Sequence, residues 1–218
     1  LIIIKKYFSK IKINLLCANS NLRVLKKQIN IFKPKYVFLS NDDASRKLKS
    51  TIKSNTKVLS FAQLCYYLRN SKSDFSILAI SGYKSLYYLD YIIKNTRNLG
   101  LVNKEAIVSA GHIFKKKKYF KKTKIFPIDS EHFSLFETFN FDNNINNFKK
   151  IILTASGGPF YNKNYKSLEK ISFSDAIKHP KWKMGYKNSI DSATLVNKCL
   201  EVVEAHYLFG IPFEKIDI

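Results

Sequence analysis

Arginine is scarce in this sequence, although the chain is strongly basic. Only four of the 38 basic residues are arginine and the others are lysine, and the formal net charge is +22 over 218 residues. A charge of this size is typical of proteins that bind nucleic acid or membrane surfaces. However, lysine, asparagine, isoleucine, phenylalanine and tyrosine are abundant along the whole chain, which fits an AT-rich codon bias as well as a selected basic patch. We therefore expect neither nucleic acid nor a membrane as a partner.

Cysteine is also rare, and long apolar runs are missing. Cys17, Cys65 and Cys199 show no CxxC spacing, which argues against a disulfide framework or a structural zinc site and fits a reducing compartment. No apolar run is long enough to span a membrane. The chain starts at Leu1 without the layout of a signal peptide, and we expect it to be incomplete.

The sequence contains no GxGxxG motif, the glycine loop that binds the pyrophosphate of a dinucleotide. In a dinucleotide-binding domain this loop joins the first strand to the first helix. Residues 1–9 fit the end of that first helix. We therefore expect the first strand and its glycine loop to lie upstream of Leu1.

The sequence does contain a regular alternation of strand and helix signals. Short apolar runs predict strands at residues 13–18, 36–39, 58–59, 75–80, 99–102, 125–128 and 151–155. Helix signals fall between most of them, at residues 22–32, 42–50, 61–68, 84–94, 104–114 and 133–139. This alternation predicts an α/β fold with a parallel sheet and crossover helices. In such sheets ligands bind beyond the carboxyl ends of the strands.

A group of carboxylates suggests a metal site. Asp129 and Glu131 are two residues apart on a segment predicted to be extended, so both side chains face the same way. With Glu201 they offer three hard oxygen ligands, which suit Mg²⁺ or Mn²⁺. The alternative is that the pair is an ordinary surface charge. His132 beside it either supports the ligands or simply packs in the core.

A predicted helix that starts with Asp191 as its N-cap carries further polar residues. Asn197, Lys198 and Glu201 are neighbours one turn apart on it, and they suit an anionic substrate bound with a metal. The alternative is a solvated helix face with an ion pair between Lys198 and Glu201.

Two loops remain open to more than one interpretation. Ser156-Gly157-Gly158 follows a strand and is either an anion-binding turn or a plain tight turn. The loop at residues 179–187 contains the only tryptophan and the only methionine, and it is either a lid over substrate or a small hydrophobic cluster.

Five motifs in a fixed order give a specific resemblance. They are NKEAIVSAG (residues 103–111), PIDSEH (127–132), ASGGPF (155–160), HPKWKMG (179–185) and DSATLVNKCLEVVEAH (191–206). In this order they closely resemble the 1-deoxy-D-xylulose 5-phosphate reductoisomerase family, of the methylerythritol phosphate route to isoprenoid precursors. The resemblance covers nearly the whole chain and is densest from Asn103 onward. Cys199 is a departure, because the family has glycine there.

The resemblance implies roles for individual residues. The implied metal ligands are Asp129, Glu131 and Glu201, which with Lys104 are also the implied catalytic residues. The implied substrate-binding residues are Ser130, Glu131, Ser156, His179, Trp182, Met184, Ser192, Asn197, Lys198 and Glu201. The implied cofactor-binding residues are Asn19, Ser20, Asn21, Ala79, Gly82, Asn103 and Glu105.

The resemblance also implies the architecture and the chemistry. We expect a Rossmann-like NADPH-binding domain over residues 1–128, without its first strand, and an α/β catalytic domain over residues 129–218, truncated at its C-terminus. The implied cofactors are NADPH and Mg²⁺ or Mn²⁺, the substrate is a small phosphate ester, and the implied assembly is a homodimer in bacterial cytoplasm or plastids. Two alternatives stay open: a catalytically incompetent remnant of such an enzyme, and a basic nucleic-acid-binding module.

Overall fold

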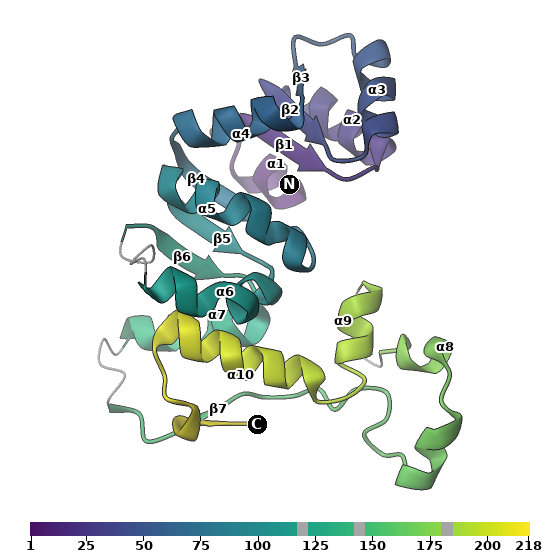
Figure 1. Ribbon diagram of the computed structural model, residues 1–218, viewed down its shortest axis with the longest axis vertical. Helices are drawn as coiled ribbons and strands as arrows, with labels where there is room; N and C mark the ends of the chain where they lie inside the picture. The colour runs from purple at the N-terminus through teal and green to yellow at the C-terminus, as the bar shows by residue number, and fades with distance from the viewer. Residues whose placement is uncertain (117–121, 142–146, 180–184) are drawn as a thin grey trace. The chain divides into compact units, whose positions relative to one another are not determined.

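The fold is α/β with parallel strands, as the sequence predicts (Figure 1). The computed structural model describes residues 1–116, 122–141, 147–179 and 185–218. The strands are β1 (Leu15–Ala18), β2 (Tyr36–Leu39), β3 (Lys57–Leu59), β4 (Ser73–Leu78), β5 (Thr96–Leu101), β6 (Lys124–Pro127), β7 (Ile151–Ile152) and β8 (Ile216–Asp217). The α-helices are α1 (Ile2–Tyr7), α2 (Leu22–Phe32), α3 (Asp42–Thr51), α4 (Phe61–Asn70), α5 (Leu86–Asn95), α6 (Lys104–Lys116), α7 (Ser130–Phe141), α8 (Phe173–Ala176), α9 (Tyr186–Asp191) and α10 (Val196–Phe209). The 3₁₀ helices are η1 (Tyr83–Ser85), η4 (Tyr165–Lys170) and η5 (Phe213–Lys215).

The chain forms two compact units, Leu1–Ser71 and Lys72–Ile218. In the first unit β1, β2 and β3 form a parallel sheet in that order. Leu25 and Ile29 from α2 and Leu48 from α3 are almost fully buried with the sheet in one core. Helix α2 begins at Asn21, whose side chain accepts a hydrogen bond from the backbone of Val24, so the cap is set locally by the sequence.

The second unit is built on a parallel sheet with the order β4-β5-β6. Strand β5 lies in the centre, and its Leu99 and Leu101 are buried against α5 and α6. A short parallel pair, β7 and β8, joins residues that are far apart in the sequence. Because the three strands of the larger sheet point the same way, their carboxyl ends lie at one edge.

Helix α10 packs along α6, and Figure 1 shows the two helices side by side. Glycine at position 111 of α6 permits this approach. A Cβ atom placed there would lie 2.4 Å from Cγ of Tyr207 and 2.8 Å from its Cβ. The side chain of Tyr207 therefore occupies the space that any larger residue at this position would need.

The structure corrects two local predictions. Residues 130–132 are not extended, because α7 begins at Ser130 and the backbone N–H of Phe133 donates to the carbonyl of Asp129. Asp191 is not an N-cap: it is the last residue of α9, and α10 begins at Val196 with no side-chain cap. Both errors come from short polar segments, where helix starts and ends carry similar residue types.

Two further expectations concern organisation. The chain divides after Ser71 by its internal contacts, and the functional division after residue 128 stays a prediction. Among the described residues, no helix combines the length and the apolar character that a bilayer crossing needs.

The close packing of α6 against α10 is testable by Gly111→Ala. Overpacking of this kind costs about 1–3 kcal/mol, and the better helix propensity of alanine offsets about 1 kcal/mol. Because the added Cβ would lie 2.4 Å from Cγ of Tyr207, we expect a cost of about 2–3 kcal/mol and, after the offset, a net loss of about 1–2 kcal/mol in the free energy of unfolding, measured by urea denaturation. Ser109→Ala, on the exposed side of α6, is the matched control and should be neutral or slightly stabilising. Equal stability of the two variants would show that the helices do not depend on this glycine.

Candidate metal and substrate site

Two neighbouring strands deliver charged residues to the same edge of the second unit's sheet. Strand β5 ends at Leu101 and Lys104 opens α6, while β6 ends at Pro127 and Asp129 immediately precedes α7. Leu101 and Pro127 are partners in the parallel register of the two strands. The side chains of Lys104 and Asp129 therefore meet, with Nζ 2.7 Å from Oδ2.

The three carboxylates expected to hold a metal ion come together in the structure. Asp129, Glu131 and Glu201 each offer an oxygen, and the three oxygens lie within 4.8 Å of one another. Glu201 reaches them from α10, where its side chain is only 1% exposed. The convergence depends on the first turn of α7 and on α10, and the extended geometry that we expected for residues 129–131 does not occur.

Two lysine side chains lie among these carboxylates. Nζ of Lys104 is 2.8 Å from Oε1 of Glu201, and Nζ of Lys198 is 2.7 Å from Oε2 of the same residue. Lys198 also pairs with Glu131, and Asn197 donates to Glu201. The carboxylate of Glu201 is thus held between two ammonium groups. The expected ion pair between Lys198 and Glu201 exists, but it is buried and does not lie on a solvated helix face.

Burial and charge act in opposite directions on this cluster. Burial by itself would lower the pKa of Lys104, but the carboxylates of Asp129 and Glu201 outweigh it and raise that pKa. Burial would likewise raise the pKa of Asp129, but hydrogen bonding to His132 and the charge of Lys104 lower it well below its usual range. Both groups therefore keep their charges because they face each other.

Glu204 lies beside this cluster and was not among the site residues predicted from the sequence. Its side chain is 1% exposed, and burial raises its pKa to about 7. His132 lies between it and Asp129, with Nδ1 3.4 Å from Oε2 of Glu204 and 3.3 Å from Oδ1 of Asp129. The only sequence signal was spacing, because Glu204 follows Glu201 by three residues and so shares its side of α10.

A second group of expected substrate-binding residues gathers at the loop after β7. Oγ of Ser156 and Nε2 of His179 are 2.9 Å apart. Gly157 and Gly158 both have positive φ, and a Cβ atom at Gly158 would lie 2.2 Å from the carbonyl oxygen of Ser192. The turn is therefore glycine-specific, and it brings Ser156 close to the segment that carries Ser192.

Other expected site residues fall into three situations. Ser130 is exposed in the first turn of α7. Asn197 faces the carboxylate cluster, where its Oδ1 accepts a hydrogen bond from Lys104 at 3.1 Å. Trp182 and Met184 lie outside the described residues, so the lid expected at this loop stays a prediction.

The expected cofactor-binding residues are divided between the units. Asn19, Ser20 and Asn21 follow β1 in the first unit, where Oδ1 of Asn19 accepts a hydrogen bond from Ser40. Ala79, Gly82, Asn103 and Glu105 belong to the second unit.

Asn103 organises the loop that follows β4. Its Nδ2 donates to the carbonyls of Ile80 and Gly82 and to Oγ of Ser85, while its Oδ1 accepts from the backbone of Glu105. The side chain of Asn103 is therefore occupied in shaping the loop. The backbone and the other side chains of this loop remain to contact a cofactor.

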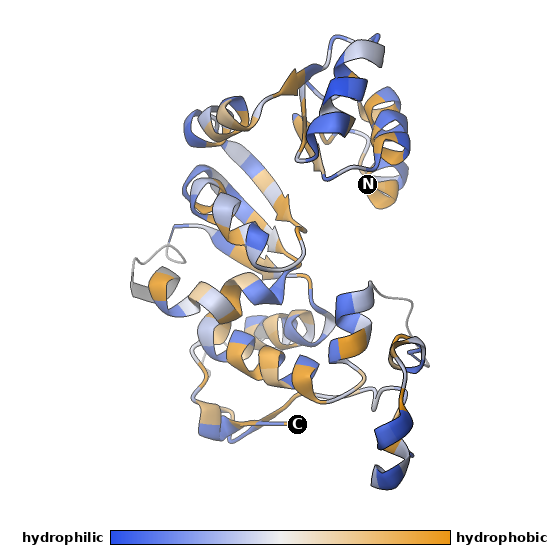
Figure 2. Ribbon diagram, turned by 45° about the vertical axis from the view of Figure 1, so that its right-hand side comes forward, coloured by the Kyte–Doolittle hydropathy of each residue, from blue (hydrophilic) through white to orange (hydrophobic). Residues whose placement is uncertain are grey.

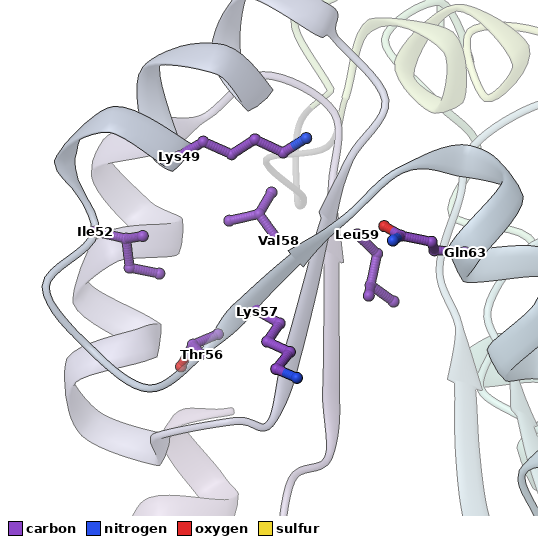
Figure 3. Close-up of a pocket in the computed structure, with 7 residues that line it drawn as sticks. All are labelled: Lys49, Ile52, Thr56, Lys57, Val58, Leu59 and Gln63. Atoms are coloured by element: carbon purple, nitrogen blue, oxygen red, sulfur yellow. The ribbon is translucent and has the colours of Figure 1, made fainter.

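A cavity of about 380 Å³ lies in the first unit (Figure 3). It is bordered by α3, β3 and α4, and its polar residues serve the local structure. Thr56 donates to the carbonyl of Pro34, and Gln63 completes the capping box of α4 with Ser60. The buried charges of the second unit are therefore the candidate functional site.

Family models match most of the chain. The model described as 1-deoxy-D-xylulose 5-phosphate reductoisomerase matches residues 1–111, and the model for the C-terminal domain of that enzyme matches residues 125–209. Curated relatives of the same name are 44% identical in Sulfurihydrogenibium sp. and 38% identical in Thermodesulfovibrio yellowstonii, each over 99% of this chain. This chain covers 55% and 56% of those relatives, and so spans about half of their length.

Solved structures agree with the family models. A crystal structure described as DOX-P reductoisomerase in complex with NADPH, fosmidomycin and magnesium has a TM-score of 0.87 and 31% identity, and the alignment covers 99% of this chain and 56% of the other. The reductoisomerase of Zymomonas mobilis in complex with NADPH has a TM-score of 0.84 and 30% identity, with 98% and 55% covered. The similarity therefore extends over both units of this chain.

The central position of Glu201 is testable without any ligand. Glu201→Gln removes the negative charge between two buried ammonium groups, although each lysine keeps a second carboxylate. Breaking a buried pair costs about 3–5 kcal/mol, and the remaining partners reduce this, so we expect a loss of about 2–3 kcal/mol. Hydrogen exchange of the backbone amides of α10 in the 218-residue chain measures this loss of stability. Glu214→Gln, an exposed acid in η5, is the control. A loss below about 0.5 kcal/mol would contradict the central role of this carboxylate.

Proposed function

The chain belongs to the 1-deoxy-D-xylulose 5-phosphate reductoisomerase family, and we propose that it carries the cofactor-, metal- and substrate-binding part of such an enzyme. The proposed reaction is the NADPH-dependent isomerisation and reduction of 1-deoxy-D-xylulose 5-phosphate to 2-C-methyl-D-erythritol 4-phosphate, a step in non-mevalonate isoprenoid precursor biosynthesis. The observation that carries the proposal is the convergence of three carboxylates with two lysines at the carboxyl ends of β5 and β6. This is where α/β sheets bind ligands.

The carboxylate cluster fits a divalent metal ion. Asp129, Glu131 and Glu201 would hold Mg²⁺ or Mn²⁺, since these ions prefer oxygen ligands and need few carboxylates. When bound, the ion supplies stabilisation of negative charge on substrate oxygens. The three carboxylates carry three negative charges and the two lysines two positive ones. A divalent ion therefore leaves the cluster with a net positive charge, which favours an anionic substrate.

The proposed phosphate-binding groups lie around the glycine turn after β7. Ser156 and His179 offer a hydroxyl and an imidazole within hydrogen-bond distance of each other, and Ser192 is close to Gly158. We assign Asn197 and Lys198 to substrate binding as well. Their present partners are the carboxylates, so contact with substrate requires one or both side chains to exchange those partners. Binding energy from a phosphate remote from the reacting carbons would then orient the substrate.

Lys104 and the acids form the proposed catalytic group. Lys104 is close to fully buried and donates toward Asp129, Glu201 and Asn197. An ammonium group in this position stabilises oxygen atoms that gain negative charge during the rearrangement. The proposed lid residues Trp182 and Met184 would exclude water from the site.

NADPH is the proposed hydride donor, with the expected contacts at Asn19, Ser20 and Asn21, at Ala79 and Gly82, and near Asn103 and Glu105. Loops after parallel strands supply these residues, as is usual for dinucleotides. Glu105 pairs with Lys187 in this structure, so one of the expected cofactor-binding residues is joined to the start of α9. Homodimer formation and a bacterial cytoplasmic or plastid location stay predictions.

The charge distribution gives little support to a nucleic-acid-binding function. Figure 2 shows hydrophilic residues on the helices of both units. The lysines with the deepest burial, Lys104 and Lys198, are paired with acids and do not face outward. The alternative of a catalytically incompetent remnant makes a different prediction. Without catalysis the metal ligands are not needed, so such a remnant is expected to bind no metal ion.

Metal binding tests the proposal directly. We expect the 218-residue chain to bind one Mn²⁺ per molecule, detected by electron paramagnetic resonance, and Asp129→Asn to weaken binding at least tenfold because one oxygen ligand loses its charge. Glu169→Gln, an exposed acid of η4, serves as the control and should leave the affinity unchanged. Equal affinities for the unaltered chain and Asp129→Asn would rule out the assigned ligands.

Lys198→Ala separates substrate binding from charge pairing. In the whole enzyme we expect kcat/KM to fall at least tenfold, or about 1.5–3 kcal/mol for a charge-assisted contact. Mn²⁺ affinity should be retained or increase, because a competing ammonium group is removed from Glu131 and Glu201. Lys166→Ala, on the exposed η4 helix, is the matched control. A value of kcat/KM within twofold of the unaltered enzyme would exclude a substrate-binding role for Lys198.

A further inference from the structure

Glu204 is a buried acid to which the proposed mechanism gives no task. It lies one turn after Glu201 on α10 and is 1% exposed. Its Oε2 is the one buried side-chain oxygen or nitrogen in the described part of the chain that meets no partner with hydrogen-bond geometry. A buried carboxylate oxygen in this situation costs stability, so its presence calls for a functional reason.

Within the described part of the chain, Oε2 of Glu204 forms its ion pair with the imidazole of His132, and the hydrogen bonds of that ring indicate where its hydrogens lie. Nε2 of His132 is 2.9 Å from the backbone carbonyl oxygen of Glu201. A carbonyl oxygen only accepts, so Nε2 carries a hydrogen. The ring is completely buried and stacks on Phe209, which restricts its orientation.

The other ring nitrogen faces two carboxylates. Nδ1 of His132 lies 3.3 Å from Oδ1 of Asp129 and 3.4 Å from Oε2 of Glu204. Two carboxylate oxygens next to a bare ring nitrogen would repel its lone pair, whereas a hydrogen on Nδ1 is attracted by both. In its ionised form Glu204 therefore favours a hydrogen at Nδ1, which His132 can donate to Asp129.

This hydrogen anchors one oxygen of a proposed metal ligand. Oδ1 of Asp129 faces His132 while Oδ2 faces Lys104, so the carboxylate has a fixed orientation in the cluster. A histidine and a carboxylate behind a metal ligand commonly hold that ligand in place.

We propose that Glu204 is a positioning residue that acts through His132 to orient Asp129 toward the metal ion. The proposal rests on the proposed function, because it assigns Asp129 to metal binding. A second metal ion among Asp129, His132 and Glu204 is the competing explanation, since their ligand atoms also lie within 4.8 Å of one another. We favour a hydrogen there, because His132 is completely buried and Glu204 is 1% exposed, whereas an ion such as Mg²⁺ usually keeps several bound waters.

The test measures Mn²⁺ affinity and thermal stability of the 218-residue chain in parallel. Glu204→Gln should weaken Mn²⁺ binding at least tenfold. The amide of the new glutamine donates to Nδ1 of His132, so Nδ1 accepts a hydrogen bond and no longer donates one to Asp129. The melting temperature should stay the same or rise, since a poorly partnered buried charge is removed. Glu214→Gln should change neither quantity.

A second variant tests whether Glu204 acts through His132. In a His132→Gln background, adding Glu204→Gln should change the Mn²⁺ affinity by less than twofold, because the connection is already broken. Additive losses would overturn the proposal, and so would a Glu204→Gln chain that binds Mn²⁺ within twofold of the unaltered chain. A Glu204→Gln chain that fails to fold or loses stability in parallel with affinity would assign a structural role instead.

Two outcomes separate this proposal from the proposed function. If the unaltered chain binds no Mn²⁺, both the metal site and the role of Glu204 are wrong. If it binds two equivalents and Glu204→Gln removes one of them, the metal site stands and the positioning role is overturned in favour of a second ion.

Discussion

The buried carboxylate of Glu201, held between the ammonium groups of Lys104 and Lys198, is the interaction on which the candidate site depends. Each ammonium group also pairs with a second acid, but Glu201 is the carboxylate that both lysines share, and burying any of these charges without partners would be costly. The arrangement also needs α6 and α10 to lie close together, which the absence of a side chain at Gly111 permits. Electrostatics and helix packing are therefore coupled in this part of the molecule.

A cluster of this kind is a weak source of stability and a strong indication of function. Buried ion pairs often add little to the free energy of unfolding compared with apolar residues of the same size. Here the cluster has two lysines, three acids and a neighbouring His132–Glu204 pair that is not fully hydrogen-bonded. Such departures from good packing occur where a protein binds ligands or carries out chemistry. The charge count explains why a cation and an anionic substrate suit the same place.

The sequence predicted that three carboxylates come together, and they do, but part of the reasoning was wrong. Asp129 and Glu131 were expected to face the same way along an extended segment, but Ser130 begins a helix and the two residues meet through its first turn. Residue types and motif order were informative because hard oxygen ligands are chemically suited to Mg²⁺ or Mn²⁺ wherever they lie. Local geometry was less certain, because the same polar residues start helices, end them and form turns.

Local signals determined the strands, most of the helices and the α/β class. Alternating apolar runs mark buried strands, and caps such as Asn21 act within a few residues of their own helix. Only the tertiary structure decided which side chains meet. Lys104 and Glu201 are 97 residues apart, and His132 and the carbonyl of Glu201 are 69 apart. The role of Glu204 is visible only in the tertiary structure. The burial and the partners of its carboxylate are set by the packing of α10 against α6 and α7, which no local pattern encodes.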